Sequence, residues 1–160
     1  YHELDQLNDV ISNVEADVIS MVGVLEHLTN PRSCLEAIKE NKNIKYLFFL
    51  VPTFSISSYF DHFFPEGFNR QLGGGHTHLY TNDSIEYFCK EYGFSRIGEW
   101  WFGSDLMDLL RHGSVKLGQN KCSEKFITEY ESMLRPHLDD LQLIFDKSKL
   151  SSEVHMVLKV

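Results

Sequence analysis

Two runs of apolar residues in the first third of the chain predict buried strands. They are residues 18–22 and 44–51, and Pro52 ends the second run. Short, nearly continuous apolar runs are typical of strands that are covered on both faces, as in a parallel sheet. Between the runs, Asn30-Pro31 indicates the start of a helix, because proline favours the first helical turn. The order strand, helix, strand predicts an α/β fold with helices on the faces of a sheet.

The rest of the chain continues with helix and strand patterns. Thr81 and Asp83 are typical of a helix start, where a capping side chain and an acid are favourable, and Gly93 is typical of a helix end. The patterns further predict strands at residues 95–101 and 153–160, a short helix at 104–111 and a long amphipathic helical region at 123–147. We expect Pro136 to kink or divide this last region, because proline removes a helical hydrogen bond.

Residues 53–81 form a long aromatic stretch without clear periodicity. Stretches of this length inside a compact domain are usually functional loops or disordered segments. The aromatic residues between Phe54 and Phe68 indicate packing rather than disorder. We therefore expect either a loop that covers a flat or apolar ligand, or a hydrophobic patch that closes the end of the sheet.

The composition indicates a globular protein with an acidic surface. Of 160 residues, 42% are hydrophobic and 24% are charged, and the formal net charge is -8. This charge disfavours nucleic acids and anionic membranes as partners, since both need a basic surface. The longest apolar run, residues 46–51, is far shorter than the roughly 20 residues that cross a bilayer. The three cysteines show no zinc-ligand spacing, so we expect free thiols in a cytoplasmic protein.

Residues 16–31, A-D-V-I-S-M-V-G-V-L-E-H-L-T-N-P, resemble the fourth strand and following turn of class I S-adenosylmethionine-dependent methyltransferases. In that family a D-V-I strand is followed by V-L-E-H-L-x-x-P and a helix. Downstream, residues 50–52 resemble the end of the fifth strand, residues 78–94 resemble the next helix with its closing G-F, and residues 154–158 resemble the seventh, antiparallel strand. The resemblance spans nearly the whole chain.

The resemblance covers only part of the family's fold. The glycine-rich turn after the family's first strand and the acid that ends its second strand are both missing from these 160 residues. Gly73-Gly74-Gly75 is no substitute, because it follows a loop and opens no helix. The resemblance implies one domain, residues 1–160, that forms the C-terminal portion of a Rossmann-like α/β sheet, strands four to seven. A helical insertion at about residues 104–147 would add a cover.

The resemblance implies a methyltransferase that uses S-adenosylmethionine and methylates a small-molecule acceptor, such as a sugar or another hydroxylated metabolite. We expect the isolated chain to be inactive and to bind this cofactor weakly or not at all, because the glycine turn and the ribose-binding acid are missing. The alternative is a non-catalytic interaction or binding module that derives from a methyltransferase and lacks the cofactor half.

The expected cofactor contacts lie at the end of the first strand, because open α/β sheets bind ligands beyond the carboxyl ends of their strands. By resemblance, the backbone of Val22, Gly23 and Val24 lies along the methionine part of the cofactor, and a glycine allows close approach. The alternative is that Gly23 only ends the strand. Glu3-Leu4 resembles the acidic position that faces the adenine amine in relatives.

Glu26-His27 follows the first strand and has two interpretations. Histidine ordinarily titrates near neutral pH, so His27 is a candidate general base. The alternative is that the pair caps the turn and the following helix. Some quinone-type O-methyltransferases resemble this segment with E-x-x-E-H and bind a divalent cation there. Because Gly23 stands at the first of these positions and offers no ligand, we predict no metal site at Glu26-His27.

His76 and His78 form the second candidate catalytic pair. In an extended segment, residues two apart point to the same side, so both side chains would face the cleft beside the aromatic stretch. Such a pair could orient or deprotonate an acceptor hydroxyl, and it could also bind a metal. The alternative is that His78 only packs or hydrogen-bonds at the start of the helix.

The first predicted strand also needs a segment or a second chain that covers it. If the family's three preceding strands are missing, residues 17–24 form a sheet edge that is apolar on both faces. Proteins normally cover such an edge, because it invites pairing with other chains. We expect it to be covered by a preceding segment of the protein, by residues 1–13, or by a second copy in a homodimer.

Overall fold

The computed structural model of the protein describes residues 6–65, 67, 69–71 and 73–160. The chain divides into two units. The first consists of residues 1–52, 76–100 and 154–160, and the second consists of residues 53–75 and 101–153. Each unit is described by itself.

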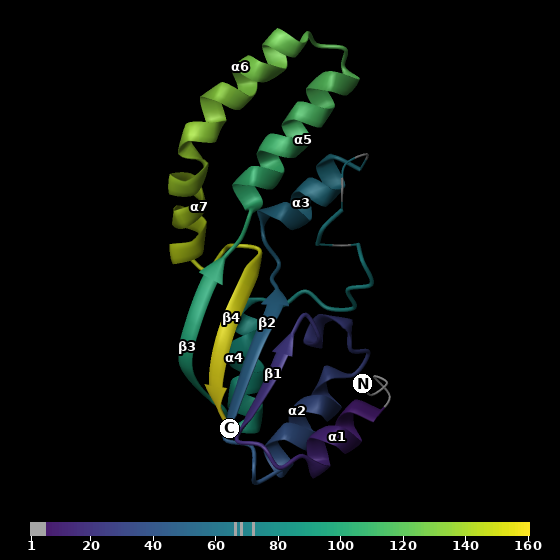
Figure 1. The fold of residues 1–160 in the computed structure, drawn as a ribbon, viewed down its shortest axis with the longest axis vertical. Helices are drawn as coiled ribbons and strands as arrows, with labels where there is room; N and C mark the ends of the chain where they lie inside the picture. Colours follow the sequence, from purple (N-terminus) through teal and green to yellow (C-terminus); the bar gives the residue numbers. More distant parts are fainter. Residues whose placement is uncertain (1–5, 66, 68, 72) are drawn as a thin grey trace. The chain divides into compact units, whose positions relative to one another are not determined.

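The first unit contains most of the sheet, whose strands follow the order β1-β2-β4-β3 (Figure 1). The strands are β1 (Val18–Val22), β2 (Tyr46–Pro52), β3 (Ser95–Phe102) and β4 (Glu153–Lys159). β1 and β2 are parallel, and Met21 lies opposite Phe49. Figure 1 shows β4 running against its neighbours, as the resemblance to a seventh, antiparallel strand implies. The predicted α/β fold is confirmed.

The described residues of the first unit form three α-helices, α1 (Leu7–Asn13), α2 (Pro31–Glu40) and α4 (Asn82–Tyr92). The last two begin where the sequence predicts. The Asn30 side chain accepts the Ser33 N–H at 3.3 Å, and Thr81 Oγ1 accepts the Ser84 N–H at 3.0 Å. Gly93 ends α4 in the left-handed conformation, with φ of 76°. The predicted starts of α2 and α4 are therefore confirmed.

Helix α1 was not evident in the sequence, because it is short and buries only one residue, Ile11. The side-chain amide of Asn41 joins it to the end of α2 by donating to the carbonyls of Ile11 and Val14 at 2.7 and 2.9 Å. At the other end, the Asn8 amide donates to Ser33 Oγ at 3.0 Å. These polar contacts, rather than a wide apolar face, hold α1 against α2.

The core of the first unit lies on one face of its sheet. Leu47, Phe49 and Val51 on β2 are fully buried, together with alternate residues of β4. Ile38 of α2 and Ile85 of α4 are fully buried as well. Alternation of buried and more exposed residues along β2 and β4 shows that the opposite face is covered less.

Strand β1 is an edge of this sheet. Val18 and Val22 are 54% and 55% exposed. The described part of residues 1–13 packs against α2 rather than over this edge. That candidate cover is therefore not observed in residues 6–13, and cover by a preceding segment or by a second copy stays a prediction.

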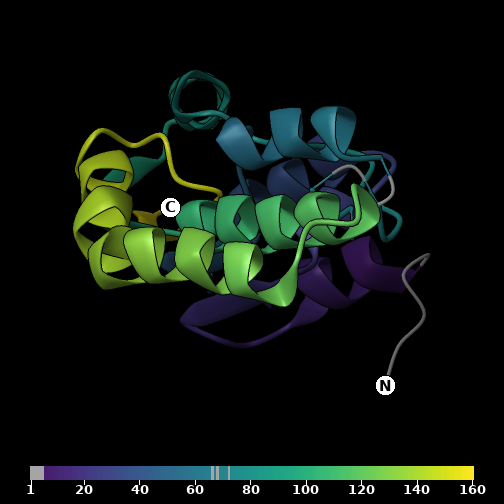
Figure 2. The ribbon, with the colours of Figure 1, turned by 90° about the horizontal axis from the view of Figure 1, so that it is seen from above.

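The second unit is helical. It contains α3 (Ile56–Phe63), α5 (Asp105–Gln119), α6 (Glu124–Leu134) and α7 (Leu138–Lys147). Helices α5 and α6 lie side by side in both views (Figures 1 and 2). Leu106 and Leu110 of α5 and Leu138 of α7 form a buried core. Pro136 lies in the short 3₁₀ turn Arg135–His137 that separates α6 from α7, as predicted.

Two expectations for the second unit are corrected. Residues 53–81 are not one loop, because α3 forms within them. Ser55 caps α3 by accepting the Ser57 N–H at 3.2 Å, and the Ser58 hydroxyl accepts the Ser55 N–H at 3.4 Å. Helix α5 extends eight residues beyond the predicted end at Arg111, to Gln119. The segment 112–119 was missed because it contains Gly113 and Gly118, which are unfavourable inside helices.

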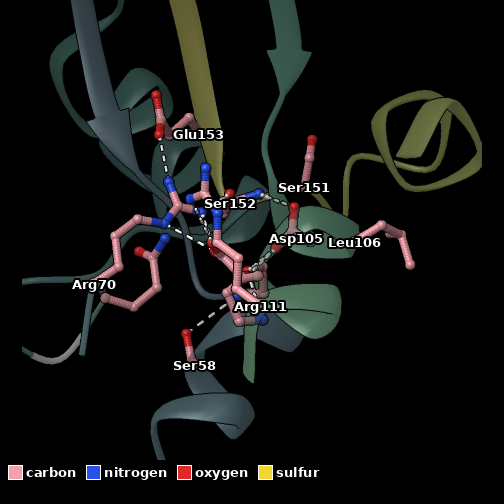
Figure 3. A network of polar contacts seen from close by, with 12 residues as sticks. Ser58, Arg70, Asp105, Leu106, Arg111, Ser151, Ser152 and Glu153 are labelled. Atoms are coloured by element: carbon pink, nitrogen blue, oxygen red, sulfur yellow. Dashed lines mark hydrogen bonds and ion pairs between the residues drawn. The ribbon is translucent and has the colours of Figure 1, made fainter. Parts of the chain in front are cut away.

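A buried polar network centres on Asp105 in the second unit (Figure 3). Asp105 is fully buried, and its Oδ1 accepts hydrogen bonds from the hydroxyls of Ser55 and Ser57, both at 2.7 Å. Its Oδ2 accepts the Ser152 N–H at 3.0 Å and the Gln142 amide at 3.1 Å.

An ion-pair group adjoins this network. Arg70 pairs with Asp108 at 2.9 Å and with Glu153 at 2.8 Å. The Arg70 guanidinium also donates to Ser152 Oγ at 2.7 Å (Figure 3). Ser152 therefore connects the two groups, since its N–H binds Asp105 and its hydroxyl binds Arg70.

None of the helices in the described residues combines the length and the apolar character needed to cross a bilayer.

Candidate functional site

The candidate site lies where β1 ends. Gly23 follows β1 with φ of +65°, and its N–H donates to the carbonyl of Leu50 at 3.2 Å. A side chain disfavours this left-handed conformation by about 1–2 kcal/mol. Gly23 therefore ends the strand and turns the chain toward the 3₁₀ turn Leu25–His27, labelled η2. A role for Gly23 in cofactor binding stays a prediction.

A segment fifty residues further along the chain holds this turn in place. The carbonyl of Glu26 accepts the N–H groups of Thr77 and His78 at 2.8 and 3.2 Å. The Tyr80 hydroxyl donates to the carbonyl of Leu25 at 3.2 Å. Because several hydrogen bonds connect the two segments, the side chains that they carry have defined relative positions.

Three side chains with metal-binding or proton-accepting atoms meet at this junction. One such atom each from Glu26, His27 and His76 lies within 4.8 Å of the others. The rings of His27 and His76 are 5.0 Å apart between centroids. The structure thus brings together two of the three histidines that the sequence nominated, from segments that are far apart in the chain.

The third nominated histidine has a different environment. His78 Nδ1 lies 2.8 Å from the hydroxyl of Thr77, and its ring centroid lies 6.3 Å from that of Tyr80. His78 is not a member of the Glu26–His27–His76 group. Its backbone N–H supports the turn, so the structure gives His78 a visible positioning role, while a catalytic role stays a prediction.

Burial shapes the electrostatics around the turn. Glu26 is only 3% exposed, and its Oε2 has no hydrogen-bond partner within the described residues. Burial raises the pKa of Tyr80 well above its usual range, and the nearby charge of Glu26 raises it further. Burial also raises the pKa of the Cys34 thiol to about 12. Tyr80 and Cys34 are therefore neutral at physiological pH, and the thiol is a poor nucleophile.

A cavity opens beside the turn. Its volume is about 350 Å³, and His27, Asn30 and Ser33 line it together with Leu7 and Leu28. One member of the three-residue group therefore reaches a space that can hold a small ligand. The lining offers both polar and apolar atoms, which is typical of small-molecule sites.

The remaining nominated residues lie at the strand end or outside the described part. Val22 is 55% exposed at the end of β1, and Val24 is the half-buried residue that precedes the η2 turn. Glu3 and Leu4 lie outside the described residues, so their predicted contact with an adenine stays a prediction.

No family model and no curated protein matches the sequence. Solved structures do match the fold. An S-adenosylmethionine-dependent methyltransferase from Archaeoglobus fulgidus is 13% identical, with a TM-score of 0.50, over 96% of this chain and 65% of that one. The methyltransferase domain of bacterial CtHen1 is 13% identical, with a TM-score of 0.46, over 90% of this chain and 52% of that one. Haemonchus contortus phosphoethanolamine N-methyltransferase 2, solved with S-adenosyl-L-methionine, is 16% identical, with a TM-score of 0.44. The match covers 89% of this chain and 33% of that one.

The chain therefore has the class I methyltransferase fold, as the resemblance of residues 16–31 implies. It spans 65% or less of the length of each of these three structures.

Proposed function

We propose that this chain is the acceptor-side part of an S-adenosylmethionine-dependent methyltransferase. The observation that carries the proposal is the group of Glu26, His27 and His76 at the carboxyl end of β1. In open α/β sheets this edge binds the ligand. The class I methyltransferase fold supports methyl transfer as the reaction class.

The residues present fit one part of the methyl donor. The strand end at Val22 and Gly23 is exposed, so its backbone is accessible to the methionine part of the donor. The described residues contain no strand that leads through a glycine-rich turn into a helix, which is the usual site for the remainder of such a cofactor. We therefore expect the 160 residues alone to bind the donor weakly or not at all.

The chain's own residues would act on the acceptor. The donor, when bound, supplies an activated methyl group, so much of the rate comes from positioning. His27 lines the cavity and is adjacent to His76, and either imidazole can accept the proton of an acceptor hydroxyl. These features favour a hydroxylated small molecule, for example a sugar, as the acceptor.

The test uses the natural polypeptide that contains this chain. We expect transfer of labelled methyl from S-adenosylmethionine to a hydroxylated acceptor. The double variant H27Q/H76Q should lower kcat by about 10²–10⁴ and leave donor binding unchanged, because general-base catalysis contributes that much. The matched control is His137→Gln, an exposed histidine of the second unit. Absence of calorimetric heat and of a Tm shift on adding the donor would refute the proposal.

The second candidate is a non-catalytic binding module. It is favoured by the described residues, in which no strand leads through a glycine-rich turn into a helix. The same measurements distinguish this module from the enzyme. The module would bind a small molecule at the His27 cavity, but no natural polypeptide that contains it would transfer a methyl group.

A further inference from the structure

A buried carboxylate oxygen at the end of β1 lacks a hydrogen-bond donor. Glu26 is 3% exposed, and its Oε2 accepts no hydrogen bond within the part of the chain that the structure describes. A buried carboxylate loses its hydration, and this loss is costly unless a hydrogen bond or a positive charge replaces the water. The position of Oε2 therefore favours a cation beside Glu26.

Two imidazoles lie next to this carboxylate. Ligand atoms of His27, His76 and Glu26 are all within 4.8 Å of one another. Around a divalent cation with bonds of about 2.1 Å, three ligand atoms lie about 3–3.5 Å apart. Side-chain rotations of His27 and His76 can close this difference, since both residues are only half-buried.

The backbone that carries these ligands is fixed. Glu26 and His76 come from different segments, and the N–H groups of Thr77 and His78 join these segments at the Glu26 carbonyl. The Thr77 hydroxyl adds bonds to the carbonyls of Glu26 and Leu28, both at 2.9 Å. A pre-organised arrangement of this kind lowers the cost of assembling a metal site.

The same group has open space on one side. His27 lines the cavity of about 350 Å³, which also has polar atoms from Asn30 and Ser33. A cation held by three protein ligands would therefore keep positions for water or for oxygen atoms of a ligand in this cavity. Three protein ligands with an open position are typical of catalytic rather than structural metal sites.

We infer that Glu26, His27 and His76 bind one divalent transition-metal ion and leave coordination positions open toward the cavity. Two imidazoles and one carboxylate favour Mn²⁺, Fe²⁺, Co²⁺ or Zn²⁺ over Mg²⁺ and Ca²⁺, which prefer oxygen ligands. This inference departs from the sequence-based prediction of no metal, which rested on Gly23 offering no ligand beside Glu26-His27. His76 supplies the third ligand from a segment whose position the sequence did not reveal.

The inference has two parts with different foundations. Cation binding follows from the three side chains and is independent of methyl transfer. A role for the cation rests on the proposed function: with the cation bound, His27 and His76 would act as ligands rather than as bases, and the cation would hold an acceptor hydroxyl in the cavity and make it acidic enough to lose its proton to water.

Titration with Co²⁺ tests the site, by calorimetry and by the visible absorption band that four- or five-coordinate Co²⁺ gives. We expect one Co²⁺ per chain, displaced by Zn²⁺ but not by an equal concentration of Mg²⁺. Glu26→Gln and His76→Ala should each weaken Co²⁺ binding at least about tenfold, the loss seen even for outer-shell partners. His137→Ala, which removes an exposed histidine, should bind Co²⁺ like the wild type.

Circular dichroism checks that each variant folds. If Glu26→Gln does not fold, His76→Ala still tests the site. Absence of both a Co²⁺ band and calorimetric heat of Co²⁺ binding in the wild-type chain would overturn the inference. Equal Co²⁺ affinity in the wild type and a folded variant would also overturn it, because the metal would then bind adventitious surface histidines.

Donor binding is measured separately, by calorimetry with S-adenosylmethionine on the natural polypeptide. Co²⁺ binding without donor binding would support the cation site and reject the methyltransferase. Donor binding without Co²⁺ binding would support the methyltransferase and reject the cation site. The two proposals therefore fail in distinguishable ways.

Discussion

Two buried carboxylates in the two units of this chain have opposite surroundings. Asp105 is fully buried, and four donors surround its two oxygens: the hydroxyls of Ser55 and Ser57, the Gln142 amide and the Ser152 N–H. Glu26 is almost as deeply buried, but its Oε2 has no donor within the described residues.

The difference separates a structural carboxylate from a candidate functional one. Four hydrogen bonds saturate Asp105, so it has no capacity left for a ligand and serves to join α5 to segments near Ser55 and Ser152. Glu26 keeps an acceptor that the protein does not use, beside two imidazoles. Burial alone therefore does not identify a site, whereas burial combined with an unsatisfied atom does.

The largest expected effect comes from breaking the saturated network. Asp105→Asn places an amide NH₂ against groups that donate hydrogen bonds, and buried donors are left without acceptors. We expect the free energy of unfolding to fall by about 3 kcal/mol or more, measured by urea denaturation. The matched control Asp139→Asn changes an exposed residue of α7 and should stay within about 0.5 kcal/mol. Equal losses in both variants would show that Asp105 is not a structural centre.

A smaller effect is expected where the chain turns toward Glu26. Gly23→Ala forces a side chain into φ of +65°, although the added Cβ would meet only Glu26 Oε1, at an ordinary 3.6 Å. We expect a loss of about 1–2 kcal/mol from the backbone alone. The control Gly98→Ala adds a Cβ at an ordinary 3.8 Å from Val157 and should not destabilise the sheet. A neutral Gly23→Ala would show that the turn toward Glu26 adapts without strain.

A further prediction concerns the hydrogen bond that holds the turn. Tyr80→Phe removes the bond to the Leu25 carbonyl and should cost about 1 kcal/mol near neutral pH. Because burial raises the pKa of Tyr80 in the folded state, its protonated form stabilises the fold below the ordinary tyrosine pKa of about 10, and this stability is lost as pH rises further. The difference between the wild type and Tyr80→Phe should therefore narrow above pH 10 or so in chemical denaturation.

The control for Tyr80→Phe is Tyr59→Phe, which changes an exposed tyrosine of α3. It should alter neither the stability nor its alkaline pH dependence. A constant difference between the wild type and Tyr80→Phe across the alkaline range would contradict the burial of this hydroxyl.

The sequence predicted the elements that follow local rules. The apolar runs of β1 and β2 and the capping residues Asn30 and Thr81 placed two strands and two helices correctly. It failed for α1 and α3, which have weak local signals. α3 has two buried serines, Ser57 and Ser58, in its first turn. It leaves the aromatic residues Tyr59 and Phe63 at least half exposed, so polar and apolar residues do not separate into an exposed and a buried face.

The candidate site was predictable in its parts but not as a whole. Glu26-His27 and His76 were each nominated from local patterns. Their meeting depends on hydrogen bonds between Thr77 and Glu26, a contact across fifty-one residues that no local pattern encodes. The same limit explains the Asp105 network, whose members Ser55, Gln142 and Ser152 are ordinary polar residues in the sequence.

The smallest expected effect on stability is that of Glu26→Gln, and it gives the sharpest test of the difference between Glu26 and Asp105. Without added metal, Glu26→Gln should change the free energy of unfolding by less than about 1 kcal/mol, because it removes a buried charge whose Oε2 has no donor. With Co²⁺ at a hundred times its dissociation constant, the wild type should gain about 2.7 kcal/mol and Glu26→Gln much less. The control Glu129→Gln, at an exposed position of α6, should respond to Co²⁺ like the wild type. A metal-free loss as large as that of Asp105→Asn would instead place Glu26 in a saturated structural network.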